Sequence, residues 1–153
     1  MSVISKRGVD LLQGESLALF ASALRGVGVN VGGTAVVVNG ERSRVIFLLD
    51  VTTLATEVDD TLDVFVDVLA PDQVTWLNAI HYPQILGNGA AAKHFGILDA
   101  SAPGTATIVS TSDAAVSTVR PSLFGSQYRG RYTIVDPGVG VGQFTFALTA
   151  YAL

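Results

Sequence analysis

Alternation of apolar and polar residues is clearest in the segment Thr61–Leu69. Leucine or valine occupies every second position there, and two of the positions between them hold Asp63 and Asp67. A period of two with β-branched residues predicts a β-strand that buries one face. Asp67 is therefore assigned to the solvent face, so Asp67→Asn should do little, whereas Val66→Asp should unfold the domain. The predicted inward-facing residues are Leu62, Val64, Val66 and Val68.

The neighbouring segment 44–51 is also predicted to be a strand, but its pattern differs. Residues 45–49, with the sequence VIFLL, form an apolar run with no polar alternation. A run of this kind predicts a strand that is covered on both faces. The two strands together are expected to form the centre of a β-sandwich.

The rest of the chain is rich in predicted strands. Residues 17–24 fit either the helical or the strand period, and we interpret them as a strand because four glycines follow. Alternate residues from Val74 to Ile80, including Trp76 and Asn78, are expected to share one strand face. Near the C-terminus, Tyr128, Tyr132 and Ile134 should point away from Arg129, Arg131 and Thr133. Further strands are expected at residues 34–38, 93–98, 105–109 and 144–148.

Turn signals separate these strands at intervals near ten residues. Asn39-Gly40 predicts a hairpin that joins strand 34–38 to strand 44–51. Residues 110–126 form a long polar connection, and loops of that length are usually functional or part of an interface. The aromatic residue before Pro83 raises the odds of a cis bond there.

About nine strands and no predicted helix indicate an all-β protein. The spacing is typical of a single antiparallel β-sandwich, jelly-roll-like or Ig-like. We expect this sandwich to occupy residues 15–153, and residues 1–14 to form an N-terminal arm that could order on a neighbouring molecule.

The composition points to a large contact with another protein. Of the 153 residues only 14% are charged, 49% are hydrophobic, and the mean hydropathy is +0.48, so the chain has little charge with which to coat its surface. No apolar run approaches the roughly 20 residues of a membrane-spanning helix. Pairs such as Phe65 with Leu69, or Ala147 with Tyr151, lie on faces that one core need not cover. A net charge of −4 without a basic cluster argues against nucleic acid as a partner.

Carboxylates are the first candidates for chemistry. Glu57, Asp59, Asp60 and Asp63 could hold a hard divalent cation, but they lack the spacing of a calcium loop, and a solvated turn explains them. Asp63 and Asp67 share a strand face about 13 Å apart, at 3.3–3.4 Å per residue. That separation is wider than the roughly 5–9.5 Å between the carboxylates of glycosidases.

Histidines, aromatic residues and glycines complete the candidates. His81 and His94 lie outside any zinc-binding spacing, and no G-x-S-x-G element supports a nucleophilic serine. The glycines of 26–32 and 138–142 lack the pattern of a phosphate loop and are interpreted as turns. With no cysteine, disulfides and thiolate sites are excluded. We therefore expect no catalytic, cofactor-binding or metal-binding residue. An exposed aromatic face could instead bind sugar, although strand aromatics are more often core; its members would be Trp76, Tyr82, Tyr128 and Tyr132.

Three segments together resemble a known class of protein. They are LDVFVDV at 62–68 followed by WLN at 76–78, QYRGRYT at 127–133, and QFTFAL at 143–148. This order resembles the small all-β virion proteins of tailed bacteriophages, particularly capsid decoration (cement) proteins. The resemblance extends loosely from residue 17 to residue 153. Its motifs are strand patterns, so it transfers no site residue.

The resemblance implies a structural role and not catalysis. It implies a sandwich that self-associates as a homotrimer or homodimer on the virion surface and clamps the major capsid protein lattice of a phage head from outside. Alternatives are a carbohydrate-binding β-sandwich module and a tail or baseplate component.

Overall fold

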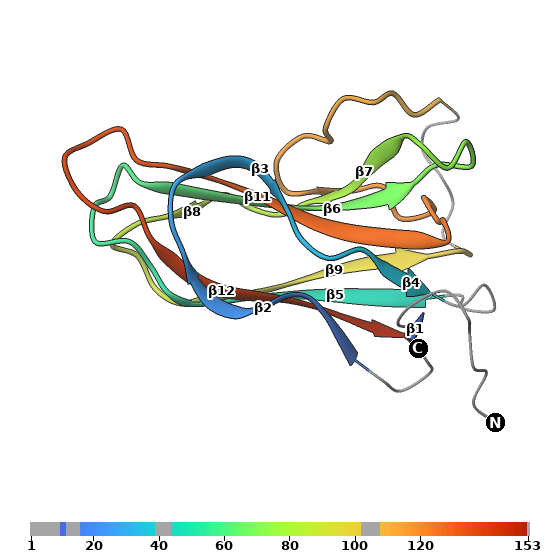
Figure 1. The fold of residues 1–153 in the computed structure, drawn as a ribbon, viewed down its shortest axis with the longest axis horizontal. Coiled ribbons are helices and arrows are strands. Elements are labelled where there is room, and N and C mark those ends of the chain that lie inside the picture. Colours follow the sequence, from blue (N-terminus) through green and yellow to red (C-terminus); the bar gives the residue numbers. More distant parts are fainter. Residues whose placement is uncertain (1–9, 12–15, 39–43, 102–107, 153) are drawn as a thin grey trace.

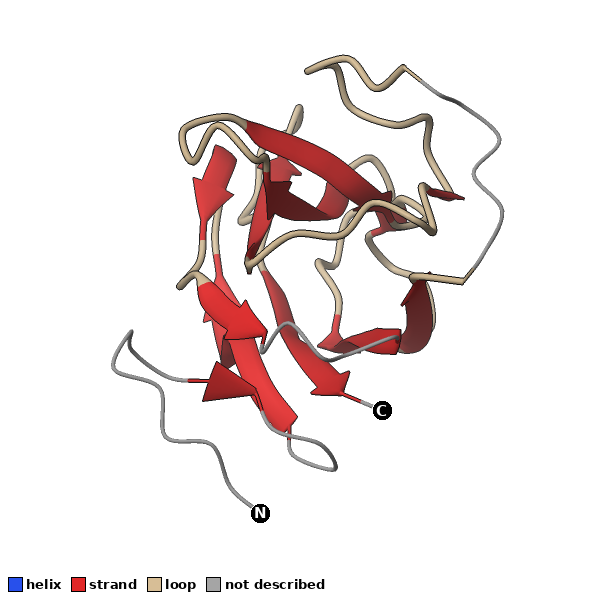
Figure 2. Cartoon of the chain, turned by 90° about the vertical axis from the view of Figure 1, so that its right-hand side faces the viewer, coloured by secondary structure: helices blue, strands red, loops and turns tan. Residues whose placement is uncertain are grey.

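The computed structural model of the chain describes residues 10–11, 16–38, 44–101 and 108–152 (Figure 1). These residues form strands, turns and loops without any helix (Figure 2). Accordingly, the described part contains no helix that is long and apolar enough to cross a membrane. The prediction of an all-β sandwich is confirmed.

Two sheets lie face to face as two layers (Figure 1). Sheet A has the strand order β1-β4-β11-β6-β7-β10, and β3 and β8 pair with β11 and β6 respectively. Its strands are β1 (Asp10–Leu11), β3 (Gly28–Gly32), β4 (Val36–Val38), β6 (Thr61–Leu69), β7 (Trp76–His81), β8 (Ile85–Leu86), β10 (Thr118–Val119) and β11 (Gln127–Val135). Sheet B has the order β2-β12-β5-β9, and its strands are β2 (Ser16–Arg25), β5 (Arg44–Thr53), β9 (Ala92–Asp99) and β12 (Phe144–Ala152). All pairings are antiparallel except that of β1 with β4.

The inner faces of the two sheets form one hydrophobic core. The four aliphatic residues predicted to face inward on β6 are all buried, as are Tyr128, Tyr132 and Ile134 on β11. Phe20 of β2 contacts Tyr132 and Phe146 edge-on, with ring centroids 5.4 and 5.7 Å apart. A Cβ atom at Gly130 would lie 2.7 Å from a ring carbon of Phe20, so only glycine lets the two sheets approach at this point.

The predicted hairpin between residues 34–38 and 44–51 is wrong. β4 pairs with β11 in sheet A, whereas β5 pairs with β12 and β9 in sheet B. The chain therefore crosses from one layer to the other between these strands. The Asn39-Gly40 turn lies outside the described residues. A turn signal is local and does not specify whether the next strand returns to the same sheet.

A bulge in β7 also corrects a prediction. Asn78 lies opposite Asp67, but Ile80 lies opposite Val66, so the register shifts by one residue at Ala79. Asn78 consequently lies on the outer face, while Ile80 faces the core. The residues at alternate positions from 74 to 80 therefore do not share one face.

Three further predictions concern the N-terminal arm, the strand 105–109 and the peptide bond before Pro83. Of the predicted arm 1–14, only Asp10 and Leu11 are described, and they form β1. The predicted strand 105–109 lies outside the described residues up to 107, and residues 108 and 109 are not in a strand. The bond before Pro83 is trans.

Candidate functional site

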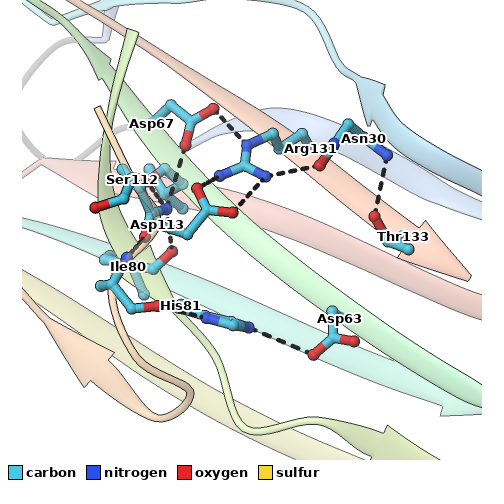
Figure 3. Close-up of polar contacts among 12 residues, drawn as sticks. Asn30, Asp63, Asp67, Ile80, His81, Ser112, Asp113, Arg131 and Thr133 are labelled. Carbon is cyan, nitrogen blue, oxygen red and sulfur yellow. Dashed lines mark hydrogen bonds and ion pairs between the residues drawn. The ribbon is translucent and has the colours of Figure 1, made fainter. Parts of the chain in front are cut away.

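A network of charged and amide side chains lies on the outer face of sheet A (Figure 3). The polar cluster, as we call it, centres on Asp67 of β6, whose carboxylate accepts hydrogen bonds from Arg131 (2.8 Å), Arg129 (3.3 Å) and Asn78 (3.2 Å). Both arginines come from β11, where they point away from the core as predicted. The other members of the polar cluster are Asn30 and Asp113.

The burial of Asp67 corrects its assignment to the solvent face. Asp67 is only 2% exposed, and Arg131 is buried as well. Burial lowers the pKa of Arg131, but hydrogen bonds and charge from Asp67 and Asp113 outweigh that effect and raise its pKa above the ordinary value. The guanidinium is therefore charged, and the pair is a buried ion pair of the kind that is costly to break.

The connection after residue 107 covers this face (Figure 1). Asp113 pairs with the Arg131 guanidinium. The N–H of Ala114 donates to the Asn78 side chain (2.9 Å), and its carbonyl accepts from Nδ1 of His81 (2.8 Å). Side chains of β7 thus bind both the N–H and the carbonyl of Ala114. These two hydrogen bonds anchor the predicted long connection 110–126 to sheet A.

Phe65 and Leu69 lie on the outer face of sheet A and are buried. The Arg131 guanidinium lies 4.0 Å from the centroid of the Phe65 ring, and the His81 ring lies 4.2 Å from it on the same sheet face. The prediction that Phe65 and Leu69 form a spare apolar face is wrong, because both side chains are buried.

A pocket of about 420 Å³ opens beside the polar cluster. Trp76 lines it, and the Arg129 guanidinium lies 4.4 Å from the Trp76 ring centroid. Two arginines and two aspartates line the pocket, so their formal charges cancel. A neutral polar lining with one aromatic ring suits an uncharged polar ligand better than an anion or a cation.

The predicted aromatic face is divided between the core and this pocket. Tyr82, Tyr128 and Tyr132 are buried, and burial raises the pKa of Tyr128 to about 12. The Tyr82 hydroxyl donates to the Phe47 carbonyl (2.6 Å). Only Trp76 of the four remains partly exposed at a polar surface.

The structure separates the two histidines. His81 lies on the outer face of sheet A, with Nε2 3.4 Å from the Asp63 carboxylate, and His94 lies in β9 of sheet B. Both ring nitrogens of His81 face acceptors, Ala114 and Asp63, and neither faces a serine hydroxyl. The Asp63 carboxylate also accepts a hydrogen bond from the side-chain amide of Gln84 (2.9 Å).

A second cluster lies at the end of the sandwich reached by the 54–60 and 136–142 loops. The acidic group, as we call it, consists of Glu57, Asp60 and Asp136, and one carboxylate oxygen from each of them lies within 4.8 Å of the other two. Burial raises the pKa of the Asp60 carboxyl. The charge of Asp136, a hydrogen bond that the protonated Asp60 carboxyl makes with Asp136, and the charges of Glu57 and Asp59 raise this pKa further. Of the four acidic residues singled out in the sequence, Glu57 and Asp60 belong to the acidic group, and Asp59 lies near it.

Asp136 is the member that the sequence did not indicate. It follows β11, and its carboxylate accepts hydrogen bonds from the N–H groups of Gly138 and Gly142, each at 3.0 Å. The only local signal is an aspartate at the start of the glycine-rich turn, which is commonplace in loops. The glycines of 138–142 do form a turn, as predicted.

The outer face of sheet B contrasts with that of sheet A. Cross-strand pairing places Ile46 beside Ile97 and Leu48 beside Phe95, and Tyr151 beside Ile46 from the other side. We call these five residues the sheet B face. Phe95 is 63% exposed and Ile97 44%. The run 45–49 is therefore buried on one face only, which corrects the prediction that both faces are covered.

Comparison of the chain with protein-family models, curated proteins and solved structures finds no match.

Proposed function

We propose that this chain is a structural protein of a phage virion, a capsid decoration protein that binds the outside of the head and stabilises the major capsid protein lattice. The observation that carries the proposal is the sheet B face. Five apolar side chains lie together on this sheet surface; Phe95, Ile97 and Tyr151 are exposed, and Ile46 and Leu48 between them are half-buried. A contiguous exposed patch of this kind is typical of a protein–protein interface.

Two features of the chain support this function. The low fraction of charged residues suits a protein that covers much of its surface with partners. The segments that resemble decoration proteins are 62–68 followed by 76–78, 127–133 and 143–148, and they lie in β6, β7, β11 and at the start of β12. Each copy needs only modest affinity, because many sites on one lattice raise the effective concentration.

Binding to the assembled lattice but not to free subunits would stabilise the shell by mass action. Self-association as a homotrimer or homodimer would add contacts between neighbouring copies. The sheet B face is the surface that we assign to these contacts.

The test is quantitative mass spectrometry of purified phage particles that encode the chain. We expect the chain in near-stoichiometric ratio to the major capsid protein. A few copies per particle would instead support a tail or baseplate component. Absence from the particles would overturn the proposal.

The binding surface can be tested separately with Ile97→Lys, which places a charge in the sheet B face. We expect it to abolish self-association and particle binding, measured by light scattering and co-sedimentation. Val74→Lys is the matched control, because Val74 is also an exposed β-branched residue but lies in the turn before β7. Equal binding by the two variants would show that the sheet B face is not the interface.

A carbohydrate-binding module is the second candidate, and the pocket beside Trp76 favours it. The buried tyrosines remove most of the predicted aromatic face, and Arg129 occupies one side of the Trp76 ring. Trp76 is the chain's single tryptophan, so its fluorescence reports directly on this pocket. A saturable fluorescence change on adding neutral oligosaccharides would favour this function over the first.

A further inference from the structure

The acidic group at the end of the sandwich has the composition of a cation site. Its three side chains offer only carboxylate oxygens, which are the ligands of hard divalent cations. Oxygens that share one Ca²⁺ at 2.3–2.6 Å lie at most about 5 Å apart. One carboxylate oxygen from each of Glu57, Asp60 and Asp136 lies within 4.8 Å of the other two, which fits that limit.

The burial of Asp60 is an independent indication of a cation site. The residue is fully buried, and neither carboxylate oxygen has a hydrogen-bond partner. Buried carboxylates are nearly always paired with a donor or a cation, because losing hydration without compensation is costly. Among the described residues, no lysine, arginine or histidine forms an ion pair with any of the three carboxylates.

The surrounding backbone holds these carboxylates in place. The Asp60 carbonyl accepts a hydrogen bond from Gly87 (2.9 Å), and the Asp60 N–H donates to the Glu57 carbonyl (3.3 Å). A Cβ atom at Gly140 would lie 2.1 Å from a Glu57 carboxylate oxygen, so the glycine-rich turn packs directly on Glu57. Three loops therefore converge on the acidic group.

We propose that Glu57, Asp60 and Asp136 bind one Ca²⁺, which joins the 54–60 turn to the loop after β11. This replaces the expectation of no metal-binding residue. The sequence could not indicate the site, because Asp136 is remote from Glu57 and Asp60 along the chain. Ca²⁺ is favoured over Mg²⁺ because its longer bonds and variable geometry suit a wide carboxylate group.

The test uses the full-length protein after treatment with EDTA and dialysis. Thermal melts and isothermal titration calorimetry are recorded with CaCl₂, with MgCl₂, and with KCl at matched ionic strength. We expect one Ca²⁺ to bind per chain and the Tm to rise by several degrees to a plateau. A wild-type Tm that millimolar Ca²⁺ does not change would overturn the proposal, as would a response to Mg²⁺ as large as that to Ca²⁺.

Variants separate binding from folding. Asp60→Asn should lose the Ca²⁺-dependent rise in Tm, while its Tm in EDTA should equal or exceed that of the wild type, because repulsion between carboxylates is relieved. Glu57→Gln should behave in the same way. Asp59→Asn is the matched control, since Asp59 is adjacent in sequence but not a member of the acidic group. Loss of the Ca²⁺ response in Asp59→Asn as in Asp60→Asn would refute the assigned ligands.

Discussion

The outer faces of the two sheets differ in how far their side chains are exposed to solvent. On sheet A, residues Asp113 and Ala114 lie over a buried network of charged groups, and Asp67 is 2% exposed. On sheet B, apolar side chains such as Phe95 and Ile97 remain open to solvent. Charge on a strand therefore does not mark exposure in this protein, and apolarity does not mark burial. What decides is whether a distant segment returns to cover the face.

A substitution in the core between the two sheets should have the largest effect on stability. Val66 is fully buried, and Val66→Asp would place an unpaired charge between the sheets. We expect the domain to unfold, because such a charge costs several kcal/mol. Circular dichroism and thermal melts would check this. A cooperative melt near the wild-type Tm would mean that the inner face is assigned wrongly.

Asp67→Asn tests the covered face of sheet A. It removes the charge that Arg129 and Arg131 share, so we expect a loss on the order of 3 kcal/mol in the free energy of unfolding. Urea denaturation measures it. Asp50→Asn is the control, because the ion pair of Asp50 with Lys93 is exposed and contributes about 0–1 kcal/mol. Equal losses in the two variants would contradict a buried network.

Asn78→Ala should weaken the attachment of the segment around Ala114 to sheet A. The Asn78 amide donates to the Val66 and Ile80 carbonyls and accepts from the Ala114 N–H. Leaving these groups unpaired should cost about 1–3 kcal/mol. Hydrogen exchange should show faster exchange of the Ala114 amide, whereas Gln84→Ala, which alters only an exposed contact, should leave it protected. Unchanged protection in Asn78→Ala would show that the segment is held by other contacts.

The smallest effect is expected on the open face of sheet B. Phe95→Ala should change the free energy of unfolding of the monomer by no more than about 0.5 kcal/mol, because the side chain is largely exposed. Phe47→Ala, on the opposite face of the adjacent strand, should cost about 3–5 kcal/mol. Chemical denaturation at low protein concentration compares the two. A large loss for Phe95→Ala would mean that the monomer itself covers this face.

Local patterns in the sequence predicted which residues of a strand share a face. The faces of β6 and β11 were correct, because alternation fixes them wherever a strand is regular. β7 failed at Ala79, because a bulge reverses the alternation without a clear sequence signal. The apparent hairpin before β5 failed because pairing across the sandwich is decided by distant strands.

The candidate sites were harder to predict for the same reason. Asp67 and Phe65 looked exposed in isolation, but both contact Arg131, which in turn pairs with Asp113, a residue more than 40 positions later in the chain than either. The acidic group needs Asp136, which is separated from Asp60 along the chain by six strands, β6 to β11. Sequence spacing carries no information on such meetings, because they arise only when the loops converge.

The anchoring of Ala114 has a consequence for tolerance to sequence change. Asn78 and His81 bond to the backbone of Ala114 and not to its side chain, so the segment is held whatever its outward-facing residues are. The next residues, Ala115 to Ser117, are exposed. A foreign peptide inserted between Ala115 and Val116 should therefore be displayed on the surface while the fold beneath it is retained. The covered face of sheet A thus offers an attachment point for engineered epitopes that leaves the sheet B face untouched.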